Sequence, residues 1–274
     1  MKTIVVSDLH LGYDMCNKAA FLKFLEDVCT KLSDHDQLIL IGDILDFWRA
    51  NSVTVLLDNA VSAVFEKLRK LRAHVIYVVG NHDYTILNVG YRERKPFTVK
   101  KSHRFEDNGV NFFLTHGYEF EVLANLAPLT VEDYEKLCVR LCHQQDLVGG
   151  FLSALYRLPR RVYEMISRRP RQPRQPKFEK LREMVVPFRV LDITKPPEVR
   201  GKPALDRIRR FAESDEKVLF FDMDRGDHLV FGHTHEPFHV PQKKVANTGC
   251  WLYNSKGYHY VEIENGRMDL IPFP

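Results

Sequence analysis

Five short apolar runs along the chain each end in a cluster of polar residues, and this arrangement restricts the possible folds more than any other feature. The runs cover residues 3–8, 37–43, 74–80, 110–117 and 228–235, and Val, Ile, Leu and Phe dominate them. Continuous apolar character over so short a length is typical of strands that are covered on both faces. Helical patterns lie between the early runs, with apolar faces within residues 21–32 and 61–71.

The alternation of strand, helix and strand predicts parallel pairing through right-handed crossovers. The C-terminal stretch "GYHYVEIENGRMDLIPF" differs, because its apolar residues alternate at period two on both sides of Asn265 and Gly266. An Asn-Gly pair between two such runs favours a hairpin with a type I′ turn, which needs positive φ at both positions. The sequence therefore predicts an α/β fold with mixed sheet pairing and helices outside.

Residues 1–274 are predicted to form a single domain, with residues 123–203 as a helical, basic insertion between two core strands. Prolines gather in the insertion, at 159, 170, 173, 176 and 187. From Arg157 to Arg182 there are ten Lys or Arg and two acids, a balance of +8, so the total of +4 leaves the rest of the chain at −4. A local basic patch of this kind favours contact with an anionic partner.

The composition indicates a folded protein of a reducing compartment. No run reaches the roughly 18 apolar residues that span a bilayer, and the N-terminal stretch lacks the pattern of a secretory signal. Five cysteines in irregular positions suit the cytoplasm better than a disulfide framework. Cys138 and Cys142, with His143 beside them, are interpreted as buried apolar residues rather than a second metal site. Trp48 and Trp251 either border a site or fill the core.

Residue types that bind metals follow the predicted strands. They are Asp8 and His10, Asp43 and Asp46, Asn81 and His82, His116, and His233 and His235. The carboxyl ends of strands in α/β sheets line the ligand crevice, so these side chains are expected to converge. Alternation along an extended chain predicts that Asp8 and His10 reach one ion together, and likewise His233 and His235.

Mixed imidazole, carboxylate and amide donors suit Mn²⁺, Fe or Zn²⁺ better than Ca²⁺, and we expect two ions, with Mn²⁺ the first choice. Asp43 is the predicted bridging carboxylate. Two metals about 3.5 to 4 Å apart can activate a shared water and hold a phosphoryl group for in-line attack. His82, positioned by Asp46 or Asp83, is the predicted catalytic residue, which would protonate the leaving oxygen or stabilise charge on the phosphoryl group.

The motifs "DLH", "GDILD", "GNHD", "THG" and "GHTH" stand in the order found in the calcineurin-like metallophosphoesterases, and the chain resembles that family from Asp8 to His235. The resemblance implies a four-layer αββα sandwich, that is, two sheets flanked by helices. It also implies that Asp46 orients His82. One metal would be held by Asp8, His10, Asp43 and His235, and the other by Asp43, Asn81, His116 and His233.

Within the family the chain looks most like the UDP-2,3-diacylglucosamine pyrophosphatases, on "SDLHLG", "GDILDFW", "NTGCW" and the ending "MDLIPFP". That likeness implies hydrolysis of the pyrophosphate of a nucleotide-sugar lipid at a membrane surface, hence a cytoplasmic enzyme that is peripheral at the membrane. The chain departs from the group at His82, where many members carry Arg.

The substrate is expected to be a nucleotide- or lipid-linked phosphate compound, with the insertion as its lid. Apolar residues such as Leu147 and Phe151 precede the basic run. Such a segment suits an anionic membrane surface or an acyl chain, while Arg157, Arg160 and Arg161 bind phosphate; the alternative is internal packing with solvated arginines. A nuclease is the second interpretation, weakened because no aromatic residues interleave the arginines. A non-catalytic scaffold is the third, disfavoured because all the ligand residues are present.

Overall fold

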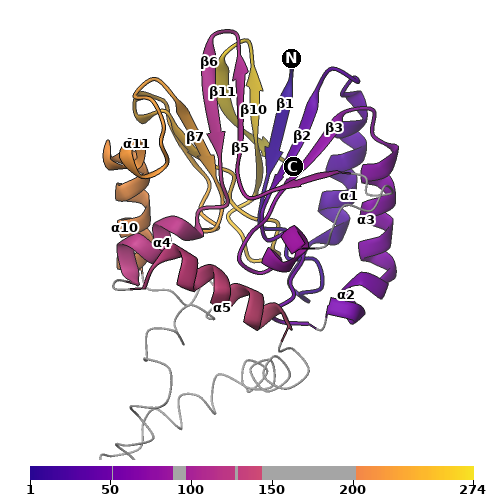
Figure 1. Ribbon diagram of the computed structural model, residues 1–274. Helices are drawn as coiled ribbons and strands as arrows, with labels where there is room; N and C mark the ends of the chain where they lie inside the picture. Colours follow the sequence, from indigo (N-terminus) through magenta and orange to yellow (C-terminus); the bar gives the residue numbers. More distant parts are fainter. Residues whose placement is uncertain (51, 89–96, 127–128, 144–201) are drawn as a thin grey trace, which may run out of the picture.

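The computed structural model describes residues 1–50, 52–88, 97–126, 129–143 and 202–274. Within these residues the strands form two sheets, and helices lie against their outer faces (Figure 1). The six-stranded sheet has the order β11-β10-β1-β2-β3-β4, and the five-stranded sheet has the order β5-β6-β7-β9-β8.

The six-stranded sheet contains the first three predicted strands. Its members are β1 (Thr3–Val6), β2 (Gln37–Ile41), β3 (His74–Val78), β4 (Thr98–Lys100), β10 (Tyr258–Glu264) and β11 (Arg267–Phe273). β1, β2 and β3 pair in parallel, which confirms the pairing expected from the strand and helix alternation. β10 and β11 form the predicted hairpin, with φ of 55° at Asn265 and 75° at Gly266, and β10 pairs antiparallel with β1.

The five-stranded sheet brings together the other two predicted strands and three further ones. Its members are β5 (His103–Asp107), β6 (Val110–Leu114), β7 (His228–Phe231), β8 (Phe238–Val240) and β9 (Val245–Asn247). β6 and β7 pair in parallel although more than a hundred positions separate them in the chain. The site residues that follow β6 and β7 therefore start from neighbouring strands.

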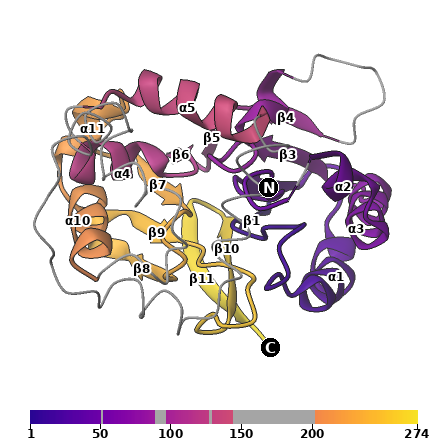
Figure 2. The ribbon, with the colours of Figure 1, turned by 90° about the horizontal axis from the view of Figure 1, so that it is seen from below.

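Apolar side chains fill three layers, two outside the sheets and one between them. Val5, Ile39 and Ile76 from the first sheet pack against Phe112 and other residues of the second. Alternate residues of the same strands, such as Ile4 and Val6, face the other way. There α1 (Lys18–Asp27) and α3 (Asn59–Lys70) cover the first sheet, whereas α4 (Tyr118–Asn125) and α10 (Lys202–Glu213) cover the second (Figure 2). The four-layer αββα architecture is confirmed.

Polar caps fix where the helices on the first sheet begin. The Asn17 side chain accepts a hydrogen bond from Ala20 N at 3.0 Å at the start of α1. Asp58 accepts from Ala60 N and Val61 N, at 2.8 and 3.0 Å, at the start of α3. The other helical segments are η1 (Cys29–Lys31), α2 (Ser52–Leu57), η2 (Tyr84–Asn88), α5 (Val131–His143), α11 (Glu216–Phe220) and η5 (Pro241–Lys243). None of the helices within the described residues combines the length and apolarity that crossing a bilayer requires.

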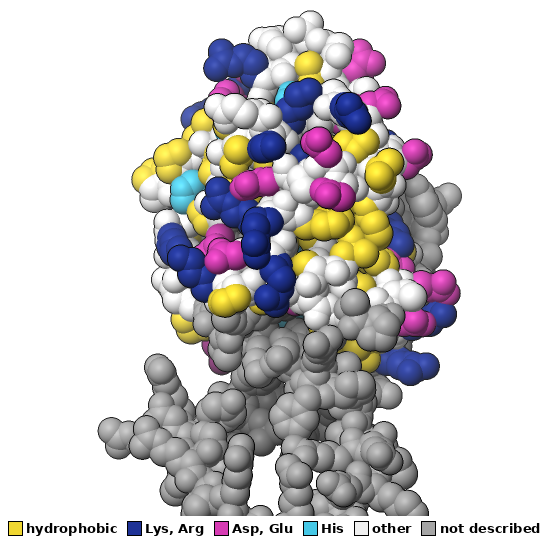
Figure 3. Space-filling model, turned by 90° about the vertical axis from the view of Figure 1, so that its left-hand side faces the viewer, with side chains coloured by type: hydrophobic (Ala, Val, Ile, Leu, Met, Phe, Trp, Pro, Cys, Tyr) yellow, Lys and Arg dark blue, Asp and Glu magenta, His cyan; other side chains and the backbone are white. Residues whose placement is uncertain are grey.

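Most of the predicted insertion, 123–203, lies outside the described residues. This includes the predicted lid and its arginines, Arg157, Arg160 and Arg161. The described flanks lie close together, because Arg207 Nε of α10 donates to Asn125 Oδ1 of α4 at 2.6 Å. The face that α10 and α11 cover carries Lys and Arg beside acidic and apolar side chains (Figure 3). The described part of the surface on this side is thus mixed in charge.

Cys138 and Cys142 of α5 are buried in the core beside the first sheet. Among the described residues, neither cysteine belongs to a group of side chains that could hold a metal ion. Both positions therefore fit the interpretation as small apolar residues. Trp251 is fully buried in the same core, stacked on Tyr258 at a centroid distance of 5.2 Å. Trp48 lies beside the site and is described below.

Candidate metal centre

The strands end before the predicted site residues, earlier than the apolar pattern indicates. β1 ends at Val6, two residues before Asp8, and β7 ends at Phe231. The backbone then turns left-handed at Asp8, His10, Asp43, His233 and His235, where φ lies between 52° and 66°. Such residues cannot continue a strand. The two side chains of Asp8 and His10 do lie together, but not through the alternation of an extended strand, so the predicted reason was wrong.

Backbone hydrogen bonds hold the loops after the strands against one another. His10 N donates to Asp43 O at 2.8 Å, and Gly232 N donates to His116 O at 2.9 Å. A Cβ atom at Gly80 would lie 2.2 Å from Asp43 Oδ1, and one at Gly232 would lie 2.3 Å from Asp8 Oδ2. Glycine at these two positions lets one loop approach the carboxylate of another.

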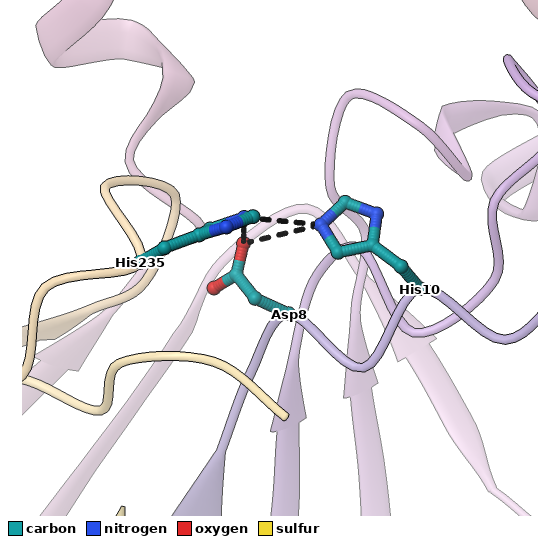
Figure 4. A group of neighbouring side chains, drawn as sticks. All are labelled: Asp8, His10 and His235. Atoms are coloured by element: carbon teal, nitrogen blue, oxygen red, sulfur yellow. Dashed lines mark hydrogen bonds and ion pairs between the residues drawn. The ribbon is translucent and has the colours of Figure 1, made fainter. Parts of the chain in front are cut away.

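The first group of converging side chains is Asp8, His10 and His235 (Figure 4). His235 Nε2 lies 3.2 Å from Asp8 Oδ1 and 3.1 Å from His10 Nε2. Asp8 Oδ2 accepts a hydrogen bond from His233 N at 2.9 Å, whereas the buried Oδ1 atom has no hydrogen-bond partner among the described residues. A buried carboxylate oxygen that faces two imidazole nitrogens has the surroundings that suit a cation ligand.

The second group is Asp43, His116 and His233, with Asn81 beside it. His116 Nδ1 donates to Ile41 O at 3.0 Å, so Nε2 of the neutral ring carries a lone pair. That lone pair faces Asn81 Oδ1 at 3.1 Å, His233 Nδ1 at 3.3 Å and Asp43 Oδ2 at 3.3 Å. Two oxygens and two imidazole nitrogens thus converge here, and this donor set suits a cation.

Asp43 lies between the two groups. Its Oδ2 atom is 3.3 Å from His116 Nε2 in the second group and 3.8 Å from His10 Nε2 in the first. Its Oδ1 atom accepts a hydrogen bond from His82 N at 2.8 Å, which fixes the carboxylate. This is the position that a bridging ligand needs.

The electrostatics of the two groups favour a bound cation. Burial lowers the pKa of His116, but the carboxylates of Asp43 and Asp8 outweigh burial and raise this pKa to about 10. Burial likewise opposes ionisation of Asp43, yet His116 and His82 bring its pKa well below the usual range. The cluster thus holds a proton on His116 at neutral pH unless a metal replaces it, because metal and proton compete for the same lone pair.

His82 and Asp46 form a pair beside the first group. His82 Nδ1 lies 2.9 Å from Asp46 Oδ1, and the ring of Trp48 stacks on His82 with centroids 4.3 Å apart. Of the two carboxylates considered as partners for His82, Asp46 makes the contact. Asp83 instead accepts from Gly80 N at 2.6 Å and from Ile44 N at 2.8 Å, and so ties the loop after β3 to the loop after β2. Burial and the nearby Asp43 raise the pKa of Asp83 to about 6.

Three residues next to the site were missed from the sequence. Arg49 pairs with Asp46, and Glu121 of α4 has its Oε2 atom 3.5 Å from His233 Nε2. Ser7 Oγ donates to Asp8 Oδ2. Arg49 and Glu121 are ordinary charged residues in sequence, and only the packing of α4 and of the loop after β2 brings them to the site. Of the three, Ser7 could have been predicted from the sequence, because it directly precedes Asp8.

Comparisons with known proteins agree with the motifs. A "UDP-2,3-diacylglucosamine hydrolase" of Photorhabdus laumondii is 22% identical over 100% of this chain and 100% of its own. One of Shewanella halifaxensis is 27% identical over 119 residues, 43% of this chain and 48% of that protein. For the relative from Shewanella halifaxensis and those from two other Shewanella species, the matching part of this chain spans about half of their length.

Among solved structures, one titled as a novel archaeal phosphodiesterase is 15% identical over 99% of both chains, with a TM-score of 0.41, too weak a likeness for any conclusion. The match to a whole family is more direct. Residues 1–237 fit the family described as "Calcineurin-like phosphoesterase", well over half of the chain. The two histidine and carboxylate groups lie within this matched region. The chain therefore belongs to the calcineurin-like phosphoesterase family.

Proposed function

We propose that the protein is a hydrolase that uses two divalent metal ions to cleave a phosphodiester or pyrophosphate bond in a nucleotide- or lipid-linked substrate. The observation that carries this proposal is the pair of buried groups, Asp8 with His10 and His235, and His116 with His233, that share Asp43 between them. Membership of a phosphoesterase family supports the hydrolase part.

The residues present fit a pair of ions. Asp8, His10 and His235 would hold one, and Asn81, His116 and His233 would hold the other, with Asp43 common to both. Bound divalent ions supply Lewis acidity at the phosphoryl oxygens and a water that is activated near neutral pH. The donor set of imidazole, carboxylate and amide favours Mn²⁺, with Fe and Zn²⁺ as alternatives.

The chain itself supplies orientation and a proton. Ionised Asp46 can only accept hydrogen bonds, so His82 donates from Nδ1 and turns Nε2 inward, 3.9 Å from Asp43 Oδ2. From Nε2 His82 would give a proton to the leaving oxygen. The stacked Trp48 ring keeps the imidazole in this plane and excludes water from one of its faces. Catalytic roles are therefore assigned to His82, directly, and to Asp46, through His82.

The substrate class is inferred from the curated relatives. Their name, UDP-2,3-diacylglucosamine hydrolase, describes a nucleotide sugar that carries two acyl chains. A substrate with apolar chains and two phosphates matches the apolar and basic character of the sequence from Leu147 to Arg182. In this proposal Arg157, Arg160 and Arg161 bind phosphate.

A substrate panel tests the proposed function. Metal-loaded protein would be incubated with Mn²⁺ and a phosphomonoester, a phosphodiester, UDP-2,3-diacylglucosamine, other nucleoside diphosphate compounds and single-stranded DNA. We expect turnover that chelation abolishes, with the acylated nucleotide sugar cleaved fastest. Preferred cleavage of DNA would favour the nuclease interpretation. No turnover of any compound at full metal occupancy would overturn the proposal.

Contact with a membrane has its own test. Full-length protein and a variant without residues 147–182 would be co-sedimented with anionic and neutral vesicles. We expect binding of the full chain to anionic vesicles alone and more than tenfold weaker binding of the shortened one, since ten basic residues are removed and each contributes about 1 kcal/mol near such a surface. Equal binding of both forms would reject the membrane role.

A further inference from the structure

The Asp46 carboxylate contacts the imidazole rings of two different site residues, His82 and His10. Its Oδ1 atom lies 2.9 Å from His82 Nδ1, and its Oδ2 atom lies 3.0 Å from His10 Nδ1. Arg49 provides the other two contacts, from its backbone N to Oδ1 at 3.0 Å and from Nη1 to Oδ2. A carboxylate has about four lone-pair sites, and these contacts use all of them.

Arg49 is itself held firmly. Its side chain is 13% exposed, and its guanidinium lies over the ring of Tyr13 with its central carbon 4.4 Å from the ring centroid. Within the described residues, no other Lys or Arg forms an ion pair with Asp46, Asp43 or Asp8. Asp46 is fully buried, and among the described residues Arg49 is the Lys or Arg that compensates its charge.

The orientation of Asp46 decides where both imidazoles point. Because His10 meets the carboxylate through Nδ1, its Nε2 atom faces Asp8 Oδ1 at 3.9 Å and His235 Nε2 at 3.1 Å. Because His82 meets the other oxygen in the same way, its Nε2 atom faces Asp43. A rotation of the carboxylate would displace both rings at once. One side chain outside the ligand set thus influences a metal ligand and the proposed acid together.

We propose that Arg49 is a positioning residue, which holds the Asp46 carboxylate so that His10 and His82 present their Nε2 atoms to the centre. This rests on the proposed function where it concerns His82, but not where it concerns His10 and metal affinity. Arg49 touches Asp46 through a single guanidinium nitrogen, Nη1, which also lies 3.4 Å from His10 Nδ1. A lysine ammonium can replace a single contact of this kind, whereas a fork of two bonds would need arginine.

The test compares Arg49→Met and Arg49→Lys with Arg104→Met as a matched control. Arg104 also lies over an aromatic ring, 4.7 Å from the centroid of Phe113, and donates to the Phe221 carbonyl rather than to a carboxylate of the centre. Two quantities are measured on folded protein: Mn²⁺ affinity by calorimetry, and kcat and KM with the best substrate of the panel. Substitution of a residue that holds a metal ligand in place typically lowers metal affinity or activity by about 10- to 100-fold.

We expect Arg49→Met to weaken Mn²⁺ binding about tenfold and to lower kcat by about 10- to 100-fold, with KM changed by less than about threefold. Arg49→Lys should recover most of both, and Arg104→Met should match the wild type. A lower melting temperature with unchanged affinity and kcat would overturn the proposal in favour of a merely structural role. A large rise in KM at constant kcat would overturn it in favour of direct contact with the substrate. Wild-type protein that binds Mn²⁺ but hydrolyses nothing would remove the proposed function, and the affinity comparison would still decide the role of Arg49.

Discussion

Two sets of residues with left-handed backbone, one in hairpin turns and one around the metal centre, differ in what the conformation serves. In the hairpin turns it falls on Asn108 with Gly109 and on Asn265 with Gly266. Asn and Gly adopt it at little cost. Around the metal centre it falls on buried Asp and His residues, which adopt it less readily.

The difference teaches what each region is built for. In a turn the backbone shape is the purpose, and the residue type follows from it. At the centre the side chain is the purpose, and the surrounding hydrogen bonds, such as Asp8 N to Gly42 O at 3.1 Å, hold the backbone in an unusual shape. Substitutions at the centre should therefore change metal binding and catalysis, whereas those in turns should change stability alone.

The largest expected contrast is between Asp43→Ala and Asp222→Ala, because both aspartates have positive φ, 52° and 49°. Asp43→Ala should abolish binding of at least one ion and lower kcat/KM by about a thousandfold or more, since metals contribute several kcal/mol of charge stabilisation. Asp222→Ala should retain metal and activity. Metal content by elemental analysis and steady-state kinetics measure both. Retention of both ions and full rate in Asp43→Ala would break the comparison.

A second contrast separates catalysis from metal binding. His82→Ala should keep its metal and lose about 10²- to 10⁴-fold in kcat, the usual contribution of a general acid. The control is His35→Ala, at a side chain that is 90% exposed. Single-turnover kinetics on metal-saturated protein gives the rate of the chemical step. An unchanged rate in the His82 variant would remove that residue from the mechanism.

A third contrast compares Gly80, beside the metal centre, with Gly109, in a hairpin turn, and depends on steric space rather than on charge. Gly80→Ala would place a Cβ 2.2 Å from Asp43 Oδ1, whereas one at Gly109 would meet no atom within 4 Å. We expect Gly80→Ala to weaken Mn²⁺ binding by about 10- to 100-fold. Gly109→Ala should instead cost roughly 1 to 2 kcal/mol of unfolding free energy, from its φ of 76° alone. Calorimetric titration with Mn²⁺ would measure the first effect and urea unfolding the second. Equal Mn²⁺ affinities of the two variants would contradict the prediction.

The smallest effect is a pH dependence that arises away from the centre. Burial and the neighbouring Lys100 lower the pKa of His103 to about 4. As the pH falls below about 6.5 the unfolded chain takes up this proton before the folded one does, so stability should fall between pH 6.5 and about 4. His103→Phe keeps an aromatic ring against Phe105 and should remove about 1 to 2 kcal/mol of the difference in stability between pH 7.5 and 5. An unchanged difference in urea unfolding would contradict the assigned pKa.

Much of the fold could be predicted from the sequence because buried strands appear in it as short apolar runs. The five predicted strands, the parallel pairing of the first three and the hairpin at Asn265 are confirmed. Their ends were placed two to four residues too late, because apolar periodicity carries no record of left-handed backbone at Asp8 or His233. The strands β4, β5, β8 and β9 were missed; β4, β8 and β9 have only three residues each, and β5 (HRFED) has no apolar run.

The candidate site was likewise predicted only in part. Its predicted ligands come together because each follows a strand end, where topology alone determines position. Arg49 and Glu121 were not predicted, because they come to the site through tertiary packing of a loop and a helix. The expected sharing of one ion by His233 and His235 differs from the observed groups, in which His235 joins Asp8 and His233 joins His116. Left-handed backbone at both histidines directs their rings apart.

The central claim is that residues from five strand ends hold two metal ions around Asp43. The most direct test is anomalous diffraction from crystals of the protein grown with Mn²⁺. We predict two anomalous peaks about 3.5 to 4 Å apart, one beside Asp8, His10 and His235, the other beside Asn81, His116 and His233, with Asp43 between them. Crystals with excess Mn²⁺ and no anomalous peak among these side chains would contradict the account.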